Sequence, residues 1–173
     1  ANRHPRVNIL HPGPGVGGHC IAVDPWFIFN SAPDEAKLIH AARLVNDGKP
    51  LFVLDKINQA VEALGKEKSE TKIACLGLAF KPDIDDLRES PALAIALQVG
   101  LMGFGAHYLV EPNITKLPNG FDRQNAQLVN LEEALAESDV VLLLVDHASF
   151  KELDLGLLSG KQVVDTRGIW SDK

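Results

Sequence analysis

The hydrophobic pattern of the chain is helical in its first third. Between residues 34 and 66, apolar residues recur at intervals of three and four, which is the spacing of an amphipathic helix. Asp34 and Glu35 favour a helix start through the helix dipole. Gly48 and Pro50 interrupt the pattern, so we expect a kinked helix or two helices placed end to end.

This helical segment is apolar on more than one face, because Phe52 and Val53 widen its apolar stripe. Such a helix needs cover from two sides. A second copy of the chain would provide that cover and make a homodimer through residues 34–66. Burial against the chain's own remaining residues is the alternative, and the pattern does not separate the two.

After a charged stretch at residues 66–72, short apolar runs alternate with amphipathic segments. The expected strands are 72–78, 107–110, 128–129, 140–145 and 161–165, and the expected helices are 90–102 and 131–137. Alternating strands and helices, with strands that are nearly all apolar, predict a doubly wound, Rossmann-like parallel sheet. We therefore expect a helical region at residues 1–66 and an α/β domain at residues 67–173.

Composition narrows the class of protein. Hydrophobic residues make up 46% of the chain and charged residues 23%, which is typical of a globular protein. The net charge of −6 argues against nucleic acid or a membrane surface as a partner. The two cysteines fit a reducing cytoplasm. The chain begins at Ala1 rather than Met, so we expect it to be part of a longer protein.

Residues 13–18, GPGVGG, formally satisfy the G-x-G-x-x-G pattern of dinucleotide sites. That pattern requires a preceding strand and a surrounding βαβ unit, whereas here a barely strand-length run precedes it and a helical segment follows. We expect instead a loop whose backbone N–H groups approach an anionic or sugar ligand.

Cys20 and Asp24 follow this loop directly. A thiol at the start of a helix is activated as a nucleophile by the helix dipole, and Asp24 would lie one helical turn away. The competing interpretation is that Cys20 is a small buried hydrophobic residue. That interpretation fits Cys75, which lies within an apolar strand.

Basic residues follow two of the expected strands. Lys81 and Arg88 come after the first strand and Arg167 after the last, where doubly wound sheets bind ligands. This placement predicts a shared anionic ligand such as phosphate, although residues 83–89 could equally form a solvated, self-paired loop. The spacing of His11, His19 and Cys20 supports no metal site. We expect His40, His107 and His147 to be surface or loop residues.

Four segments in order resemble the UDP-glucose/GDP-mannose dehydrogenase family. They are GPGVGGHCIAVDPWF, RLVNDGKP, GLAFKPDIDDLRESPA and VVDTRG, and together they span essentially the whole chain. Members of this family have an N-terminal domain for NAD, a central helical dimerisation region and a C-terminal domain for the sugar nucleotide. The resemblance implies that this chain holds the end of the central region and the C-terminal domain, and that it is inactive alone.

The resemblance also implies roles for single residues. Cys20 matches the nucleophile and Asp24 the assisting aspartate. The positions that match substrate-binding residues are His4, Arg6, Gly17, Phe80, Lys81 and Arg167. His4 and Arg6 would reach the site of a neighbouring subunit, and Arg88 matches a contact to NAD. At Arg167 close relatives have Lys, which keeps the charge and changes its geometry.

The implied reaction oxidises the C6 alcohol of a nucleotide sugar to a carboxylate, with two NAD and a covalent intermediate on Cys20. HPGPGVGGHCIAVDPWF resembles the branch that acts on UDP-N-acetylmannosamine, in bacterial surface polysaccharide synthesis. UDP-glucose, UDP-GlcNAc and GDP-mannose are alternative substrates. An alternative of another class is a non-catalytic module that binds a nucleotide sugar or mediates dimerisation.

Overall fold

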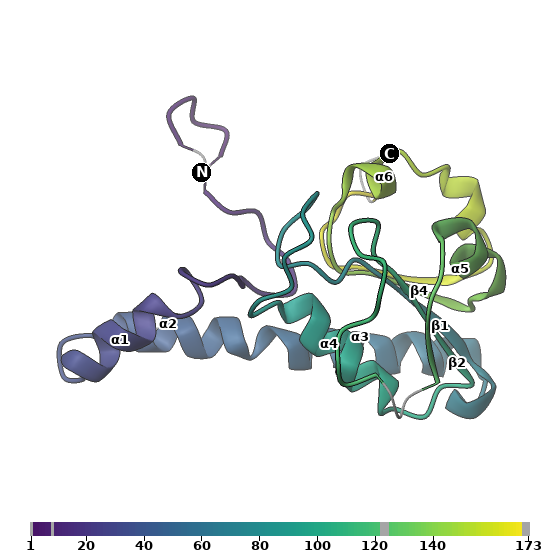
Figure 1. Ribbon diagram of the computed structural model, residues 1–173, viewed down its shortest axis with the longest axis horizontal. Coiled ribbons are helices and arrows are strands. Elements are labelled where there is room, and N and C mark those ends of the chain that lie inside the picture. Colours follow the sequence, from purple (N-terminus) through teal and green to yellow (C-terminus); the bar gives the residue numbers. More distant parts are fainter. Residues whose placement is uncertain (1, 8, 122–124, 171–173) are drawn as a thin grey trace.

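The computed structural model describes residues 2–7, 9–121 and 125–170 (Figure 1). Three helices form an elongated arm: α1 (Asp24–Ser31), α2 (Lys37–Asp47) and α3 (Lys49–Leu64). Only Gly48 separates α2 from α3, and it keeps helical dihedral angles, so the two helices run end to end as predicted. Gly65 caps the end of α3, and its φ of 65° is the left-handed conformation that glycine adopts readily.

The second part of the chain is a five-stranded parallel sheet. Its strands are β1 (Lys72–Leu76), β2 (Ala106–Val110), β3 (Ala126–Leu128), β4 (Val140–Leu143) and β5 (Gln162–Asp165). Their spatial order is β3-β2-β1-β4-β5. β2 and β3 lie on one side of β1, and β4 and β5 lie on the other. The strand order therefore changes direction between β1 and β4, which is the point where doubly wound sheets bind ligands.

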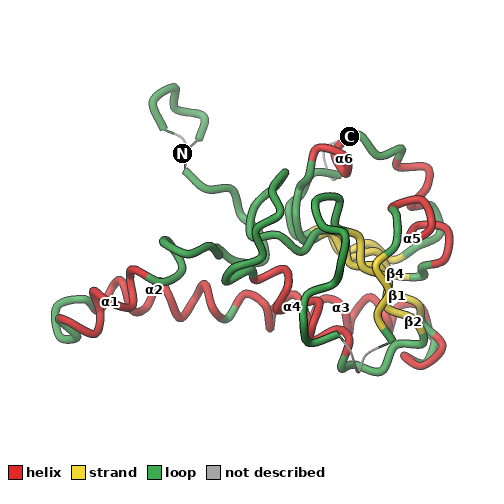
Figure 2. Tube along the Cα trace, viewed as in Figure 1, coloured by secondary structure: helices red, strands yellow, loops and turns green. Residues whose placement is uncertain are grey.

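Three helices connect the strands: α4 (Pro91–Gly100), α5 (Leu131–Glu137) and α6 (Ala148–Lys151). Two short 3₁₀ turns lie at Lys68–Glu70 and Leu155–Leu158. The Ser90 hydroxyl accepts a hydrogen bond from the backbone N–H of Leu93 and caps α4. The Asn130 side chain caps α5 in the same way, through the N–H of Glu133. Figure 2 shows α3, α4, α5 and α6 around the central sheet, whereas α1 and α2 extend away from it.

Two hydrophobic clusters cover the two faces of the sheet. Side chains of β1 alternate between them, because successive strand residues point to opposite faces. Ile73 and Cys75 pack with α3 and α4, whereas Ala74 and Leu76 pack with α5, α6 and Trp170. Helices on both faces of a parallel sheet confirm the predicted doubly wound α/β fold.

The chain itself covers only part of the helical arm. Val53, Ile57 and Val61 of α3 are buried against the sheet domain. In contrast, Leu38 of α2 is 82% exposed and Val45 is 70% exposed. The predicted second apolar face therefore exists on α2 and on the first turn of α3, and this chain leaves it open. In the described part of the chain, no helix combines the length and apolar character that crossing a bilayer requires.

Candidate functional site

A cavity of about 470 Å³ lies at the switch point of the sheet. Its walls come from residues 79–82 after β1, from residues 144–146 after β4, from Arg167 after β5 and from the glycine-rich segment. These segments are far apart in sequence, and the parallel sheet brings their ends to one edge. Ligands of doubly wound folds bind at this edge.

Four of the residues predicted to bind substrate line this cavity: Gly17, Phe80, Lys81 and Arg167. The Lys81 ammonium lies 5.6 Å from the centroid of the Phe80 ring. Among the residues that the structure describes, no carboxylate lies within 4.0 Å of this ammonium. Its positive charge is therefore available to an anionic group in the cavity.

The second cation of the cavity is fixed by a carboxylate. The Nε atom of Arg167 donates a hydrogen bond to Asp146 at 2.9 Å, and Lys151 pairs with the same carboxylate at 2.9 Å. Burial raises the pKa of Asp146, but the hydrogen bond from Lys151 and the charge of Arg167 outweigh it, and the net pKa is lowered. The sequence prediction missed Asp146, although its place directly after the apolar run at residues 140–145 could have indicated it.

The glycine-rich segment packs closely on the sheet domain. A Cβ atom at Gly17 would collide with the backbone carbonyl of Glu89, and one at Gly18 would lie 2.9 Å from the Phe80 ring. Gly18 also has a φ of 90°, which side-chain-bearing residues rarely adopt. These two glycines therefore serve packing within the chain rather than the approach to a pyrophosphate, although Gly17 also borders the cavity.

Cys20 is exposed and lies just before α1, which begins at Asp24. One helical turn between Cys20 and Asp24 is expected if the helix has begun by Cys20; the helix begins later, at Asp24, with Pro25 in its first turn. The predicted spacing holds nevertheless: the N–H of Asp24 donates to the carbonyl of Cys20 at 2.8 Å, which is one helical turn. Cys75 is fully buried as expected, and burial raises the pKa of its thiol.

Arg88 lies on the Cys20 side of the site and does not line the 470 Å³ cavity. Its guanidinium binds both carboxylate oxygens of Asp86 at 2.6–3.0 Å and lowers the pKa of Asp86 to about 2. The nearby Cys20 makes a smaller contribution to the raised pKa of Arg88. The structure thus separates Arg88 from Lys81 and Arg167, which share the cavity.

The structure does not bring His4 and Arg6 to the cavity. Both are exposed in the N-terminal segment, which extends away from the sheet domain (Figure 1). The Asn2 side chain accepts from the N–H of Ile9 and donates to its carbonyl, and so closes this segment into a loop. Within one chain, neither residue lines the cavity that Lys81 borders.

Two histidines expected at the surface are buried. His107 lies within β2, with its Nε2 atom 3.3 Å from the Cys75 sulfur, and burial lowers its pKa to about 4. His147 is 1% exposed, and its Nε2 atom lies 3.1 Å from the buried carboxylate of Glu111. Their partners lie more than 30 residues away in sequence, so local pattern gave no sign of burial. His40 is half-buried and stacks on Phe29.

Glu111 anchors the loop that leads to Phe80 and Lys81. Its carboxylate accepts hydrogen bonds from the backbone N–H groups of Leu78 and Ala79, at 2.7 and 3.0 Å. Within the described residues, no three His, Cys, Asp or Glu side chains are grouped to hold a metal ion. Two carboxylates, Glu111 and Asp146, thus fix the loop before Phe80 and the side chain of Arg167. Two cations, Lys81 and Arg167, line the cavity.

A doubly wound α/β domain with two cations at its switch point is a typical setting for an anionic ligand. Residues 74–172 match the UDP-binding domain of the UDP-glucose/GDP-mannose dehydrogenase family, and residues 1–48 match the central domain of that family. The chain belongs to the UDP-glucose/GDP-mannose dehydrogenase family.

Similar proteins cover the whole of this chain. A UDP-N-acetyl-D-mannosamine dehydrogenase of Yersinia pestis is 54% identical over 98% of it, and an NDP-N-acetyl-D-galactosaminuronic acid dehydrogenase of Ralstonia nicotianae is 54% identical over 100%. The structure of the UDP-D-ManNAc dehydrogenase of Pyrococcus horikoshii is 31% identical and superposes with a TM-score of 0.82 over 100% of this chain. The chain spans 41%, 40% and 40% of these three relatives, respectively.

Proposed function

We propose that this chain supplies the substrate-binding part of an NAD-dependent UDP-N-acetyl-D-mannosamine 6-dehydrogenase. The enzyme would act in the cytoplasm and make the uronate for bacterial surface polysaccharide. One observation carries the proposal: the segment that leads to Cys20 forms a wall of the cavity that Lys81 and Arg167 also line. The 54% identity to relatives of this name supports the choice of substrate.

In this proposal, Lys81 and Arg167 bind the diphosphate of the sugar nucleotide. Phe80 provides an apolar wall beside Lys81, and the backbone of Gly17 borders the sugar. His4 and Arg6 would come from a second subunit, since they do not line the cavity of their own chain. The open apolar face of α2 and α3 would join the two subunits, because large exposed apolar patches are typical of interfaces.

Cys20 would be the nucleophile. Its thiolate sulfur attacks the carbonyl carbon of the C6 aldehyde and forms a thiohemiacetal. Loss of a hydride from that carbon gives a thioester, and attack by water releases the carboxylate and regenerates the thiol. Asp24, one helical turn away, would orient this water and accept its proton.

NAD would accept the hydride in both oxidation steps. The glycine segment of this chain does not fit its pyrophosphate, because the chain itself occupies the space beside Gly17 and Gly18. Arg88 does fit a role towards NAD, since its side chain is 64% exposed and lies on the Cys20 side of the site. We therefore propose that Arg88 contacts NAD and that the remainder of the enzyme holds most of the cofactor.

A UDP-N-acetylgalactosamine-type sugar is the second candidate substrate, because the relative from Ralstonia nicotianae is equally similar. The test is NADH formation by the full-length enzyme with UDP-ManNAc, UDP-GalNAc, UDP-GlcNAc, UDP-glucose and GDP-mannose. We expect the highest kcat/KM with UDP-ManNAc. A preference for GDP-mannose or UDP-glucose would refute the substrate assignment, and binding without turnover of any of them would refute the dehydrogenase.

A further inference from the structure

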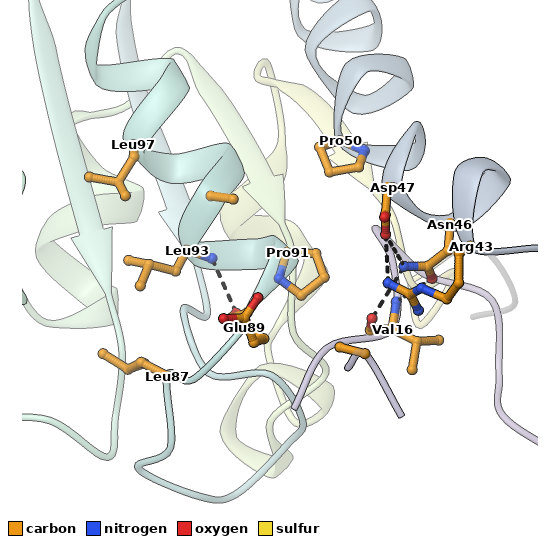
Figure 3. Close-up of a pocket in the computed structure, with 13 residues that line it drawn as sticks. Val16, Arg43, Asn46, Asp47, Pro50, Leu87, Glu89, Pro91, Leu93 and Leu97 are labelled. Atoms are coloured by element: carbon orange, nitrogen blue, oxygen red, sulfur yellow. Dashed lines mark hydrogen bonds and ion pairs between the residues drawn. The ribbon is translucent and has the colours of Figure 1, made fainter. Parts of the chain in front are cut away.

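The segment RLVNDGKP, residues 43–50, spans the end of α2 and the start of α3. Its Asn46 side chain reaches back to the glycine-rich segment (Figure 3). The Oδ1 atom of Asn46 accepts a hydrogen bond from the N–H of Val16 at 2.8 Å, and its Nδ2 atom donates to the carbonyl of Val16 at 3.2 Å. Asn46 thus binds Val16 as a neighbouring strand would.

Asp47 fixes the orientation of the Asn46 amide. The Oδ1 atom of Asp47 accepts from Nδ2 of Asn46 at 3.1 Å and from Nη2 of Arg43 at 2.6 Å. An ionised carboxylate accepts only, so the NH₂ group of Asn46 must face it. The Asn46 oxygen is then left to accept from Val16. A flipped amide would place its oxygen against two acceptors, and the network therefore allows one orientation.

Arg43 extends the same contact to the other side of Cys20. Its Nη1 atom donates to the carbonyl of Ile21 at 3.5 Å, and its side chain is 10% exposed. A cation this buried requires an ionic partner, which Asp47 provides. The end of α2 therefore holds the chain at Val16, four residues before Cys20, and at Ile21, directly after it.

Val16 separates two cavities. It lines the 470 Å³ cavity, and it also lines a second cavity of about 350 Å³ whose walls include Arg43, Asn46 and Asp47 (Figure 3). With a cavity on each side, the side chain of Val16 is less closely packed than the neighbouring Gly17, which lies against the Glu89 carbonyl. The two hydrogen bonds from Asn46 tie the backbone of Val16 to the end of α2.

We infer that Asn46 is a positioning residue that fixes the Cys20 segment relative to the substrate cavity. This inference rests on the proposed role of Cys20 as the nucleophile. A covalent step requires the sulfur to be close to the carbon that it attacks, and a displacement of about 1 Å can cost about 100-fold in rate. Asn46 touches neither Lys81 nor Arg167, so nucleotide affinity does not depend on it directly.

The test is Asn46→Asp in the full-length enzyme, where a carboxylate would face the carbonyl of Val16 and the carboxylate of Asp47. We expect kcat for acid formation to fall about 10- to 100-fold, while the Kd for UDP stays within about threefold. Asn119→Asp makes the same change at an exposed amide and should match the wild type. Asn46→Ala removes the hydrogen bonds without adding charge, and it provides the measurement if Asn46→Asp does not fold.

Cys75 reports whether each variant keeps its fold, because it is fully buried and should resist alkylation. A kcat within about threefold of the wild type in Asn46→Ala would overturn the inference. A parallel loss of kcat, UDP affinity and Cys75 protection in both variants would also overturn it, since Asn46 would then be structural. Cys20→Ser separates the two proposals: undiminished acid formation by that variant refutes the nucleophile, independently of Asn46.

Discussion

The guanidinium of Arg167 donates a hydrogen bond from Nε to the Asp146 carboxylate at 2.9 Å, where two strand ends meet. Asp146 follows β4 and Arg167 follows β5, so the pair joins the carboxyl ends of neighbouring strands. This hydrogen bond involves only the Nε atom of the guanidinium. Arg167 also lines the cavity. A carboxylate thus orients one of the two cations at the candidate site.

Replacing Arg167 by Ala should weaken UDP binding by about 10- to 100-fold, because hydrogen bonds to charged groups contribute about 1.5–3 kcal/mol each. Asp146→Asn should have a smaller effect, since Arg167 stays present but less firmly oriented. Isothermal titration calorimetry of the full-length enzyme measures both affinities. Lys116→Ala is the control, because Lys116 is exposed and outside the cavity. Unchanged affinity in Arg167→Ala would exclude Arg167 from the nucleotide site.

Gly17→Ala tests the close packing of the glycine segment. The added Cβ would collide with the Glu89 carbonyl, so the segment must shift, and overpacking of this kind costs about 1–3 kcal/mol of stability. Gly103→Ala is the matched control: a Cβ there meets nothing within 4 Å, and only its φ of 79° opposes the change. Chemical denaturation measures the loss of stability. UDP titration should show a loss of affinity in Gly17→Ala alone. Equal affinity in the two variants would contradict the packing account.

The pH dependence of stability should reflect Glu111. Burial raises its pKa, but hydrogen bonds from His147 and from the backbone of Leu78 outweigh this, and the net pKa is lowered. The ionised carboxylate therefore stabilises the fold above its unfolded pKa of about 4.3, and this contribution is lost as pH falls through the lower folded pKa. The free energy of unfolding of Glu111→Gln at pH 7 should be about 1–3 kcal/mol lower than that of the wild type. Below pH 5, it should decline less steeply with falling pH.

Urea unfolding between pH 3 and pH 7 measures this dependence. Glu62→Gln makes the same change at an exposed position near the end of α3, and it should keep the wild-type profile. A Glu111→Gln variant with the wild-type stability at pH 7 would show that the buried carboxylate does not anchor the loop at Leu78.

The open face of the helical arm predicts a change of oligomeric state. Leu51 is 67% exposed in the single chain, so Leu51→Glu should not disturb the fold of that chain. If this face joins two subunits, the buried charge should dissociate the dimer. Light scattering coupled to size-exclusion chromatography would then give half the wild-type mass. A monomeric wild type, or an unchanged dimer in Leu51→Glu, would contradict the proposed interface.

Local patterns predicted the secondary structure closely. The helix expected at residues 131–137 is α5, and the interruption at Gly48 falls between α2 and α3. Such features depend on neighbouring residues, since a helix start or stop is set by its own capping groups. The sequence also placed Lys81 and Arg167 at strand ends, and because the strands are parallel these residues meet at one edge.

Contacts across long sequence separations could not be predicted. Asn46 and Val16 are 30 residues apart, and Glu111 and His147 are 36 apart, so nothing local indicated either pair. The helix that follows Cys20 begins only at Asp24, because Pro25 suits the first turn of a helix with that start. His4 and Arg6 were matched by family resemblance alone, and in our proposal a second subunit would bring them to a ligand.

The proposed mechanism requires Cys20 to form the covalent bond to the substrate. The most direct measurement is mass spectrometry of the full-length enzyme, acid-quenched during turnover with UDP-ManNAc and NAD. We expect a sugar-nucleotide adduct on the peptide that contains Cys20, and neither adduct nor acid product in Cys20→Ser. An adduct on another residue, or acid formation by Cys20→Ser at the wild-type rate, would contradict it.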